Sequence, residues 1–404
     1  MNQVDTEWMR EQCESSGISV ANDLSSSTIT VINSCAVTSG AEKDVARWVR
    51  KAVNAEKDVI VAGCITKDYA DRLKKEYGVS AFLFGGARKR IVTALNQIAS
   101  GTDVVKWTET ADLKFSGITG MNGRTRGFLK IEEGCSGSCS YCIIPVVRGR
   151  KIISRPIEMV IDDVENLLSG GYREIVLSGT DIGSYGKDLG TSLYELLRQL
   201  IAIDKEFRIR ISSIGITALD SNLISLLGSV KICRHLHISL QSGSDKILSL
   251  MKRPYSAAMY KKKIENLINK IPDIAIGTDI IVGFPGEDDK EFLKTVSFTM
   301  DMPFVYLHPF SYSPRKGTNS YDQPFEKSAQ KERVKLLKDI VNKKNIKYRK
   351  RFLGKQVRIL AENEHSGRTS YYFPVFLQNR LKRGDFYDVT ISNVTDHDTG
   401  AAIL

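Results

Sequence analysis

Three closely spaced cysteines are the side chains of this sequence best suited to chemistry. Cys135, Cys139 and Cys142 stand in the pattern C-x3-C-x2-C. Thiolates at this spacing can hold three irons of a cubane iron–sulfur cluster, which leaves the fourth iron open for a reactant. A four-cysteine structural zinc site would need a second C-x2-C pair downstream, but Cys233 is the only later cysteine. The triad therefore predicts an iron–sulfur cluster with one open iron.

The segment that carries the triad alternates short strands with helices. Its candidate strands are Gly127–Ile131, Glu174–Ser178, Arg208–Ser212, His235–Ser239, Ala275–Val282 and Tyr306–Ser311. Helical spacing follows most of them, at Ile157–Leu168, Leu193–Ile203, Ser244–Met251 and Asp288–Met300. Six such units predict a partial (β/α)6 barrel, closed or partly open, with its chemistry at the carboxyl ends of the strands. The triad follows the first strand and so occupies this position.

Other strand ends supply candidate walls for the open iron. Gly179, Thr180 and Asp181 follow the second strand. Glycine there permits a close backbone approach, and the Thr and Asp side chains can bind hydroxyls or amines. Ser212 ends the third strand, and Gln241 beside the fourth offers both a donor and an acceptor. A plain turn with an ordinary Asp cap is the rival interpretation of Gly179, Thr180 and Asp181.

A second group of cysteines lies within residues 1–105. Buried strands are expected at Thr28–Ile32, Val59–Ala62 and Ala81–Phe84, with an amphipathic helix at Lys43–Val53. This order predicts a doubly wound parallel sheet with helices on both faces. Cys35 and Cys64, the N-terminal pair, each follow a strand, which is where such sheets bind ligands. Alone, each would more often be a small buried hydrophobe. Together they predict two ligands of a second cluster that still needs a third.

The last part of the chain changes character. Short strands are expected at Val357–Ala361, Tyr371–Phe376 and Asp385–Ile391, with breaks at Gly367 and Gly384. They predict a small antiparallel barrel, a fold that often carries oligonucleotides. The polar, glycine-rich stretch Phe115–Arg126 is expected to be a linker.

Charge favours a polyanionic partner. The 404 residues carry a net charge of +11. Glu326–Arg351 has eleven Lys and Arg against three Asp and Glu, a net +8. Its spacing predicts a helix with an apolar inner side formed by Leu336, Leu337, Ile340, Val341 and Tyr348. A solvated helix face would have a similar sequence, so the charge alone is weak evidence for a polyanionic partner.

Targeting signals are not evident in the sequence. No run of eighteen apolar residues marks a membrane span, and the N-terminus lacks a basic-then-apolar leader pattern. We therefore expect a cytoplasmic protein with no membrane partner. A reducing compartment suits cysteines that act as metal ligands rather than as disulfides.

These motifs resemble a known family. The triad, with Tyr141 before its last cysteine, resembles the radical S-adenosylmethionine (SAM) enzymes. Within them the chain is similar to the methylthiotransferases, through the motifs Asn33-Ser34-Cys35, Ala62-Gly63-Cys64, Ile143-Ile144-Pro145, Arg148-Gly149-Arg150, 240–245 (LQSGSD) and 279–287 (DIIVGFPGE). The resemblance covers nearly the whole chain. It implies an N-terminal methylthiotransferase domain (1–105), a radical SAM core (121–349) and a TRAM-like RNA-binding domain (350–404).

The resemblance also implies cofactors. Two 4Fe-4S clusters are expected, the second held by Cys35 and Cys64. SAM would chelate the open iron of the first cluster through its amino and carboxylate groups, and the reduced cluster would cleave it to a 5′-deoxyadenosyl radical. The residues expected to bind SAM are Tyr141, Gly179, Thr180, Asp181, Ser212 and Gln241.

The loop Ser178–Gly190 resembles the branch that acts on N6-threonylcarbamoyladenosine in tRNA. The implied reaction installs a methylthio group at carbon 2 of this adenine, beside the anticodon. The implied partners are tRNA and a flavodoxin-type electron donor, with the chain itself a monomer and the sulfur donor left open. Methylthiotransferases of isopentenyladenosine or of a small-subunit ribosomal protein are the alternatives.

Two departures from the family pattern affect these expectations. The family's first auxiliary cysteine would fall just before Met1, and Cys13 on the following helix is a poor substitute. Either the start is misassigned or the second cluster is incomplete. Ser213–Ile216 stands where the family more often has Ile-Glu-Pro. An inactive, RNA-binding homologue is therefore an alternative of another class.

Overall fold

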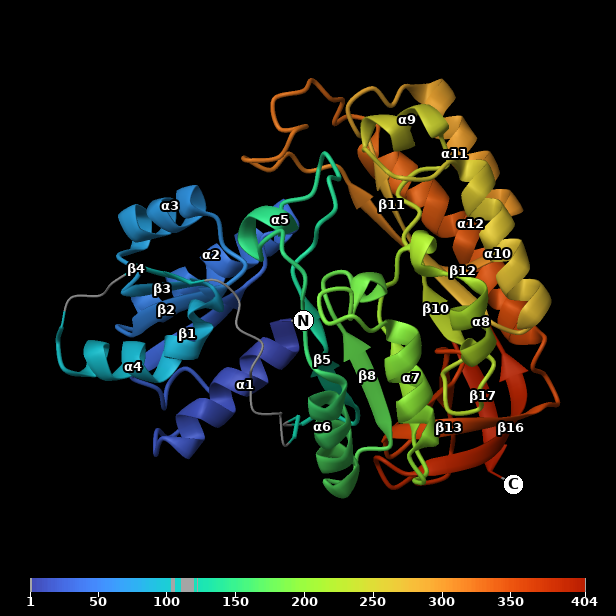
Figure 1. The fold of residues 1–404 in the computed structure, drawn as a ribbon, viewed down its shortest axis with the longest axis horizontal. Helices are drawn as coiled ribbons and strands as arrows, with labels where there is room; N and C mark the ends of the chain where they lie inside the picture. The colour runs from blue at the N-terminus through green and yellow to red at the C-terminus, as the bar shows by residue number, and fades with distance from the viewer. Residues whose placement is uncertain (1, 103–105, 110–119, 122, 404) are drawn as a thin grey trace.

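The computed structural model of the chain describes residues 2–102, 106–109, 120–121 and 123–403, and contains three sheet-based regions (Figure 1). These are an N-terminal parallel sheet, a middle set of parallel strands and a C-terminal closed barrel. Figure 1 shows the N-terminal region at one side of the middle region, with the short helix α5 (Ile144–Val147) between them. Within the described residues, no helix is long and apolar enough to span a membrane.

The N-terminal sheet has strand order β1-β2-β3-β4, and every pair is parallel. Its strands are β1 (Ile29–Ser34), β2 (Asp58–Gly63), β3 (Ala81–Gly85) and β4 (Lys106–Glu109). Side chains alternate along β2, because successive residues of a strand point to opposite faces. Val59 and Val61 pack with one pair of helices, α2 (Ser39–Asn54) and α3 (Lys67–Tyr77). Ile60 and Ala62 pack on the other face with α1 (Asn2–Ser15) and α4 (Ile91–Ala99). The expected parallel sheet with two covered faces is confirmed.

The middle region is the expected partial barrel. Two parallel three-stranded sheets, β5-β8-β9 and β10-β11-β12, meet through single bridges such as Ile214 to Ile238. Their strands are β5 (Gly127–Lys130), β8 (Glu174–Ser178), β9 (Arg208–Ile211), β10 (His235–His237), β11 (Ala275–Val282) and β12 (Phe304–Ser311). One continuous apolar core joins them to their helices. The helices are α6 (Ile157–Ser169), α7 (Leu193–Ala202), α8 (Ser221–Leu227), α9 (Asp245–Leu250), α10 (Ala257–Lys270), α11 (Asp289–Asp301) and α12 (Gln330–Lys350).

The C-terminal region is a closed barrel of order β13-β14-β15-β17-β16, as the sequence predicted in outline. Its strands are β13 (Gln356–Asn363), β14 (Ser366–Thr369), β15 (Pro374–Phe376), β16 (Phe386–Val394) and β17 (Thr399–Ile403). The expected strand Tyr371–Phe376 is wrong in its first half. Tyr372 has a φ of 74° and lies outside any strand. Its ring stacks on His235 with centroids 4.7 Å apart, and its hydroxyl accepts a hydrogen bond from Arg210. Tyr372 therefore links the C-terminal barrel to strands β9 and β10 of the middle region.

The basic segment before this barrel is a helix, α12, but its inner side differs from the expected one. Leu337, Val341 and Tyr348 are buried, whereas Leu336 is 43% exposed. Part of the charge is structural, because Arg349 donates hydrogen bonds to Asp398 and Thr399 of the small barrel. The positive charge of α12 is thus only partly available to a partner. Of the expected linker Phe115–Arg126, residues 115–119 and 122 lie outside the described residues.

Candidate iron–sulfur sites

The triad lies on a loop at the carboxyl end of β5. The short strands β6 (Glu132–Glu133) and β7 (Ile153–Ser154) pair and close the base of this loop. Gly134 begins it with a φ of +96°, and a Cβ at this residue would lie 2.0 Å from the carbonyl oxygen of Lys151. The Cys135 amide donates to the Gly149 carbonyl at 3.1 Å. Only glycine fits at residue 134, and its conformation directs the chain into the cysteine loop.

The three thiols of the triad lie near one another. A Cβ at Gly137 would lie 3.2 Å from the Cys135 sulfur and 4.0 Å from the Cys139 sulfur. Arg253 donates a hydrogen bond to the Cys139 sulfur at 3.0 Å. Burial above all, together with the neighbouring thiols Cys139 and Cys135, raises the pKa of Cys142 to about 11. Thiols crowded in this way lose their protons when a cation binds them, so the residues present fit a metal cluster.

Beside the triad lies a buried acid that the sequence reasoning missed. Glu132 Oε2 accepts a hydrogen bond from the Asp181 amide at 2.8 Å, and burial raises the pKa of Glu132 to about 8. A Cβ at Gly179 would lie 2.3 Å from the same oxygen. The loop after β8 therefore closes tightly on Glu132. The signal in the sequence was a pair of carboxylates at a strand end, directly before the cysteine loop.

Two buried oxygens at this loop have no hydrogen-bond partner within the described residues. They are Glu132 Oε1 and Thr180 Oγ1. Unpaired buried polar atoms are rare in proteins and carry a desolvation cost. Thr180 Oγ1 and Glu132 Oε1 thus lie unpaired where the loop after β8 packs on Glu132, and the role of Gly179, Thr180 and Asp181 in binding stays a prediction. We take the two oxygens as atoms available to a bound ligand.

The other residues expected to bind SAM lie at strand ends as anticipated. Ser212 follows β9, and its amide donates to the Leu177 carbonyl at 3.0 Å. Gln241 has a φ of 75°, and its amide donates to the Asp279 carbonyl at 2.8 Å. Tyr141 is half-buried, with its ring edge-on to Phe284 at 6.3 Å. The turn that holds Phe284 therefore supports Tyr141 by packing.

The N-terminal pair lies at the edge of the other sheet. Ser34 pairs with Gly63 in the register of β1 and β2, so Cys35 and Cys64 leave adjacent strands side by side. Cys35 precedes α2 and Cys64 precedes α3, whose N-caps are Thr38 and Thr66. Helix N-termini favour negative charge. This placement suits an anionic cluster held by two thiolates.

Cys13 does not join this pair. It packs in the apolar cluster of α1 and α4 with Met9 and Ile60. Asn2, at the other end of α1, lies beside the pair, because its side chain donates to the Ser34 carbonyl at 2.9 Å. From Asn2 to Cys13 the helix rises about 16 Å at about 1.5 Å per residue. The expectation that Cys13 is a poor third ligand agrees with this placement.

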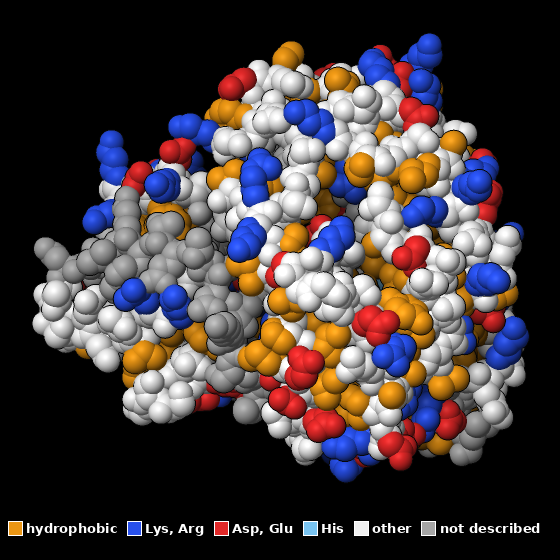
Figure 2. Space-filling view, viewed as in Figure 1, with side chains coloured by type: hydrophobic (Ala, Val, Ile, Leu, Met, Phe, Trp, Pro, Cys, Tyr) orange, Lys and Arg blue, Asp and Glu red, His pale blue; other side chains and the backbone are white. Residues whose placement is uncertain are grey.

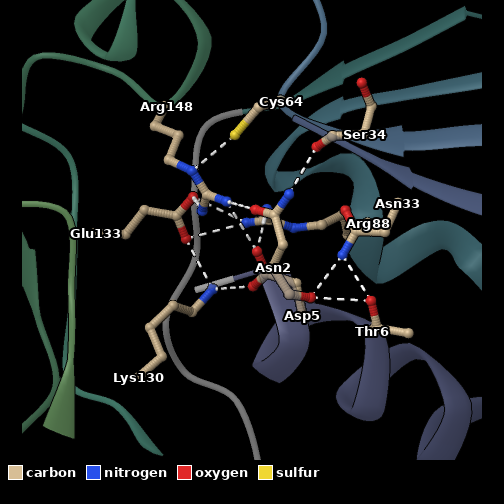
Figure 3. A network of polar contacts seen from close by, with 10 residues as sticks. All are labelled: Asn2, Asp5, Thr6, Asn33, Ser34, Cys64, Arg88, Lys130, Glu133 and Arg148. Atoms are coloured by element: carbon tan, nitrogen blue, oxygen red, sulfur yellow. Dashed lines mark hydrogen bonds and ion pairs between the residues drawn. The ribbon is translucent and has the colours of Figure 1, made fainter. Parts of the chain in front are cut away.

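The two cysteine groups meet at the junction of the two regions. Ile143, directly after Cys142, packs with Cys64 and Ala36 in one apolar cluster. Arg148, directly after α5, donates to the Cys64 sulfur at 2.9 Å (Figure 3). The chain that leaves the triad therefore forms part of the wall around the N-terminal pair.

A buried charge network fixes this junction. Figure 3 shows Asp5 and Glu133 surrounded by Arg88, Lys130 and Arg148, and all ion pairs among them are 2.6–3.0 Å long. Burial would raise the pKa of Glu133, but the three cations hold it at about 2. Three positive and two negative groups leave a net charge of +1 beside Cys64. The network therefore favours an anion at the N-terminal pair.

Comparisons with known proteins agree with this architecture. The model of the radical SAM superfamily matches residues 129–299, and that of the uncharacterized protein family UPF0004 matches residues 1–85. The threonylcarbamoyladenosine tRNA methylthiotransferase MtaB of Thermotoga maritima is 35% identical over 408 residues, covering 98% of this chain and 93% of that protein. The chain belongs to the radical SAM methylthiotransferase family.

Another sequence relative and a solved structure are also similar to this methylthiotransferase. A tRNA-2-methylthio-N(6)-dimethylallyladenosine synthase of Fervidobacterium nodosum is 32% identical, over 90% of this chain and 85% of that protein. The structure of the radical SAM methyltransferase TsrM from Kitasatospora setae, with cobalamin and a [4Fe-4S] cluster bound, shares the fold. Its TM-score is 0.60 at 13% identity, over 78% of this chain and 70% of that one. As a radical SAM enzyme, the chain uses a [4Fe-4S] cluster and SAM.

Proposed function

We propose that this enzyme converts N6-threonylcarbamoyladenosine beside the tRNA anticodon into its 2-methylthio derivative. The junction at Ile143 carries the proposal, because Ile143, the residue after Cys142, packs against Cys64. A radical generator and a sulfur carrier must both reach one adenine for this reaction. The identity to MtaB over nearly the whole chain supports the choice of substrate.

The triad is proposed to hold the cluster at which SAM binds. A cluster bound there would supply the electron for the reductive cleavage of SAM. Arg253 holds the Cys139 sulfur in place through a hydrogen bond of 3.0 Å. Thr180 Oγ1 and Glu132 Oε1 lack partners among the described residues and are proposed to bind the polar groups of SAM. The remaining proposed contacts come from the strand-end residues and the aromatic ring described above: Tyr141, Gly179, Asp181, Ser212 and Gln241.

The N-terminal pair is proposed to hold a second cluster. The two thiols lie on adjacent strands, and the network around Arg148 leaves a net positive charge beside Cys64. An anionic cluster would neutralise this charge.

The proposed partners follow from the charge and the small barrel. tRNA is proposed to contact the exposed Lys side chains of α12 and the closed barrel, since phosphate contacts need cations. Figure 2 shows Lys and Arg spread over one face rather than gathered into one patch, which favours an extended partner. The reductant is proposed to be a flavodoxin-type protein, and the enzyme to act as a cytoplasmic monomer.

Nucleoside analysis of tRNA tests the proposed substrate. Cells that lack the gene should lose 2-methylthio-N6-threonylcarbamoyladenosine and accumulate its precursor. A plasmid with the wild-type gene should restore the product, and the same gene with Cys139→Ala should not. Loss of 2-methylthio-isopentenyladenosine instead would assign the enzyme to the other tRNA branch, and unchanged levels of both nucleosides would overturn the tRNA proposal.

A further inference from the structure

Three side chains on neighbouring strands form a group that the proposed reaction leaves without a role. His237 ends β10, Asp279 lies on β11 and His308 on β12. The Nε2 atom of His237 is 2.9 Å from Asp279 Oδ1, and the Nδ1 atom of His308 is 3.5 Å from the same oxygen. All three ligand atoms lie within 4.8 Å of one another. Two imidazole nitrogens thus converge on one carboxylate oxygen.

Hydrogen bonds do not account for the position of His237, the buried member of this group. The His237 side chain is only 7% exposed. Its Nε2 atom has no hydrogen-bond partner among the described residues, although Asp279 Oδ1 is 2.9 Å away. The nitrogen and the oxygen are close, but the ring does not direct an N–H at the oxygen. Two ligands of one cation also stand this close without an N–H between them, because each presents a lone pair to the ion.

Surrounding residues hold the group in this arrangement. Ser239 Oγ donates to Asp279 Oδ2 at 2.7 Å, which fixes the carboxylate and leaves Oδ1 toward the two rings. A Cβ at Gly277 would lie 2.8 Å from His237 Nδ1, so glycine makes room for this ring. The two imidazoles stack with centroids 4.9 Å apart. Metal ligands are commonly oriented by such outer contacts.

We propose that His237, Asp279 and His308 bind a divalent transition-metal cation of the class of Mn2+, Fe2+ or Zn2+. Two imidazoles and one carboxylate form a ligand set that these ions favour, and three protein ligands leave open positions on the ion. Bonds of about 2.0–2.2 Å require ligand atoms at most about 4.4 Å apart. The His308 side chain is 64% exposed, so it is free to rotate by the small amount needed.

A chain of hydrogen bonds connects the cation site to the triad. Arg253 joins the two, because it donates to the Cys139 sulfur and to the Tyr255 hydroxyl, both at 3.0 Å. Tyr255 in turn donates to the Ser239 carbonyl at 3.0 Å, and the Ser239 hydroxyl donates to Asp279. Because three protein ligands leave positions on the cation open, we expect these positions to take oxygen ligands from water or from a substrate in the barrel.

Manganese binding followed by electron paramagnetic resonance tests the proposal. Mn2+ favours oxygen and nitrogen over thiolate ligands, so it should leave the cysteine groups alone. The anaerobic enzyme, with its clusters in the diamagnetic oxidised state, is titrated with Mn2+, and the loss of the free Mn2+ signal reports binding. We expect saturation at one Mn2+ per chain.

Variants locate the bound ion. Loss of an outer-shell partner typically costs about 10–100-fold in metal affinity, so Ser239→Ala should weaken Mn2+ binding to that extent. Asp279→Asn and His308→Ala remove ligands and should weaken it by at least about 100-fold. His397→Ala, an exposed histidine of the small barrel, is the matched control and should bind like the wild type. His308 is exposed, so its variant should fold even where the buried ones do not.

Two results would overturn the proposal. One is a folded wild-type enzyme that leaves the free Mn2+ signal unchanged, which would mean that the three side chains share a proton instead. The other is an affinity in His308→Ala equal to that of His397→Ala.

Discussion

The triad comes from one loop, whereas the N-terminal pair comes from the ends of two strands. Cys135, Cys139 and Cys142 are placed by local features, above all Gly134 and the pairing of β6 with β7. Cys35 and Cys64 are placed by the register of β1 and β2 and by contacts with α5 and Arg148 of the other region. The placement of the triad thus depends on its own local sequence, whereas the placement of the N-terminal pair depends on contacts at the junction of the two regions. This difference predicts that damage to the two groups has separable effects.

The largest expected effect is on SAM cleavage. Cys139→Ala leaves two thiols in the triad, and two thiolates hold a cubane poorly. We expect SAM cleavage to be abolished, as measured by 5′-deoxyadenosine formation in the anaerobic, reduced enzyme. Cys233→Ala changes a buried cysteine outside both groups and should keep the activity. Normal cleavage by Cys139→Ala would refute the assignment of the triad.

The second expected effect separates the two groups. Cys64→Ala should abolish methylthiolation of tRNA but keep the formation of 5′-deoxyadenosine, because the triad does not include this thiol. Both products are measured in the same reaction. A loss of SAM cleavage equal to that of Cys139→Ala would show that the two groups do not act independently.

The third expected effect is on the junction. Arg148→Met removes two buried ion pairs from the network, one to Asp5 and one to Glu133. Breaking a buried ion pair from one side costs about 3–5 kcal/mol. We expect a loss of this size in the free energy of unfolding, measured by urea titration. Arg150→Met, two residues along and exposed, should change it little. Equal stability of the two variants would mean that the network does not hold the junction.

A smaller effect depends on pH. The folded pKa of Glu132 is about 8 against an ordinary value of 4.5, so the folded state keeps a proton that the unfolded state loses. This contribution to stability is complete below about pH 4.5 and disappears as the pH rises through 8. Relative to Glu132→Gln, the wild type should lose stability steadily as the pH rises from 5 to 8. Glu165→Gln, an exposed acid on α6, should follow the wild type. Parallel stability curves for wild type and Glu132→Gln would contradict the shifted pKa.

The smallest expected effect comes from the wall beside the triad. In Gly179→Ala the new methyl group would lie 2.3 Å from Glu132 Oε2 and 3.0 Å from Ile182. Overpacking of this kind costs about 1–3 kcal/mol, which should appear as a lower urea midpoint. Gly228→Ala has no contact closer than 3.5 Å and should be nearly neutral. Equal urea midpoints for the two variants would mean that the loop after β8 shifts to accommodate the new methyl group at little cost.

The sequence was informative where local pattern decides the structure. The triad, the six strands of the barrel and the sheet around Cys35 and Cys64 all follow from spacing and apolar runs. What the sequence did not show depends on contacts between distant segments. Glu132 reads as an ordinary exposed acid until the loop at Gly179 closes over it. Tyr372 reads as a strand residue until its stacking on His235 is known. Arg148 resembled a family motif, but its bond to Cys64 required the tertiary fold.

Iron and sulfide counts on the purified enzyme test the central claim most directly, namely that both cysteine groups hold a cluster. We predict about eight irons per chain in the wild type, and about four in a variant with Cys35→Ala and Cys64→Ala, since each cubane holds four. About four irons in both proteins would contradict the account, because the N-terminal pair would then hold no cluster.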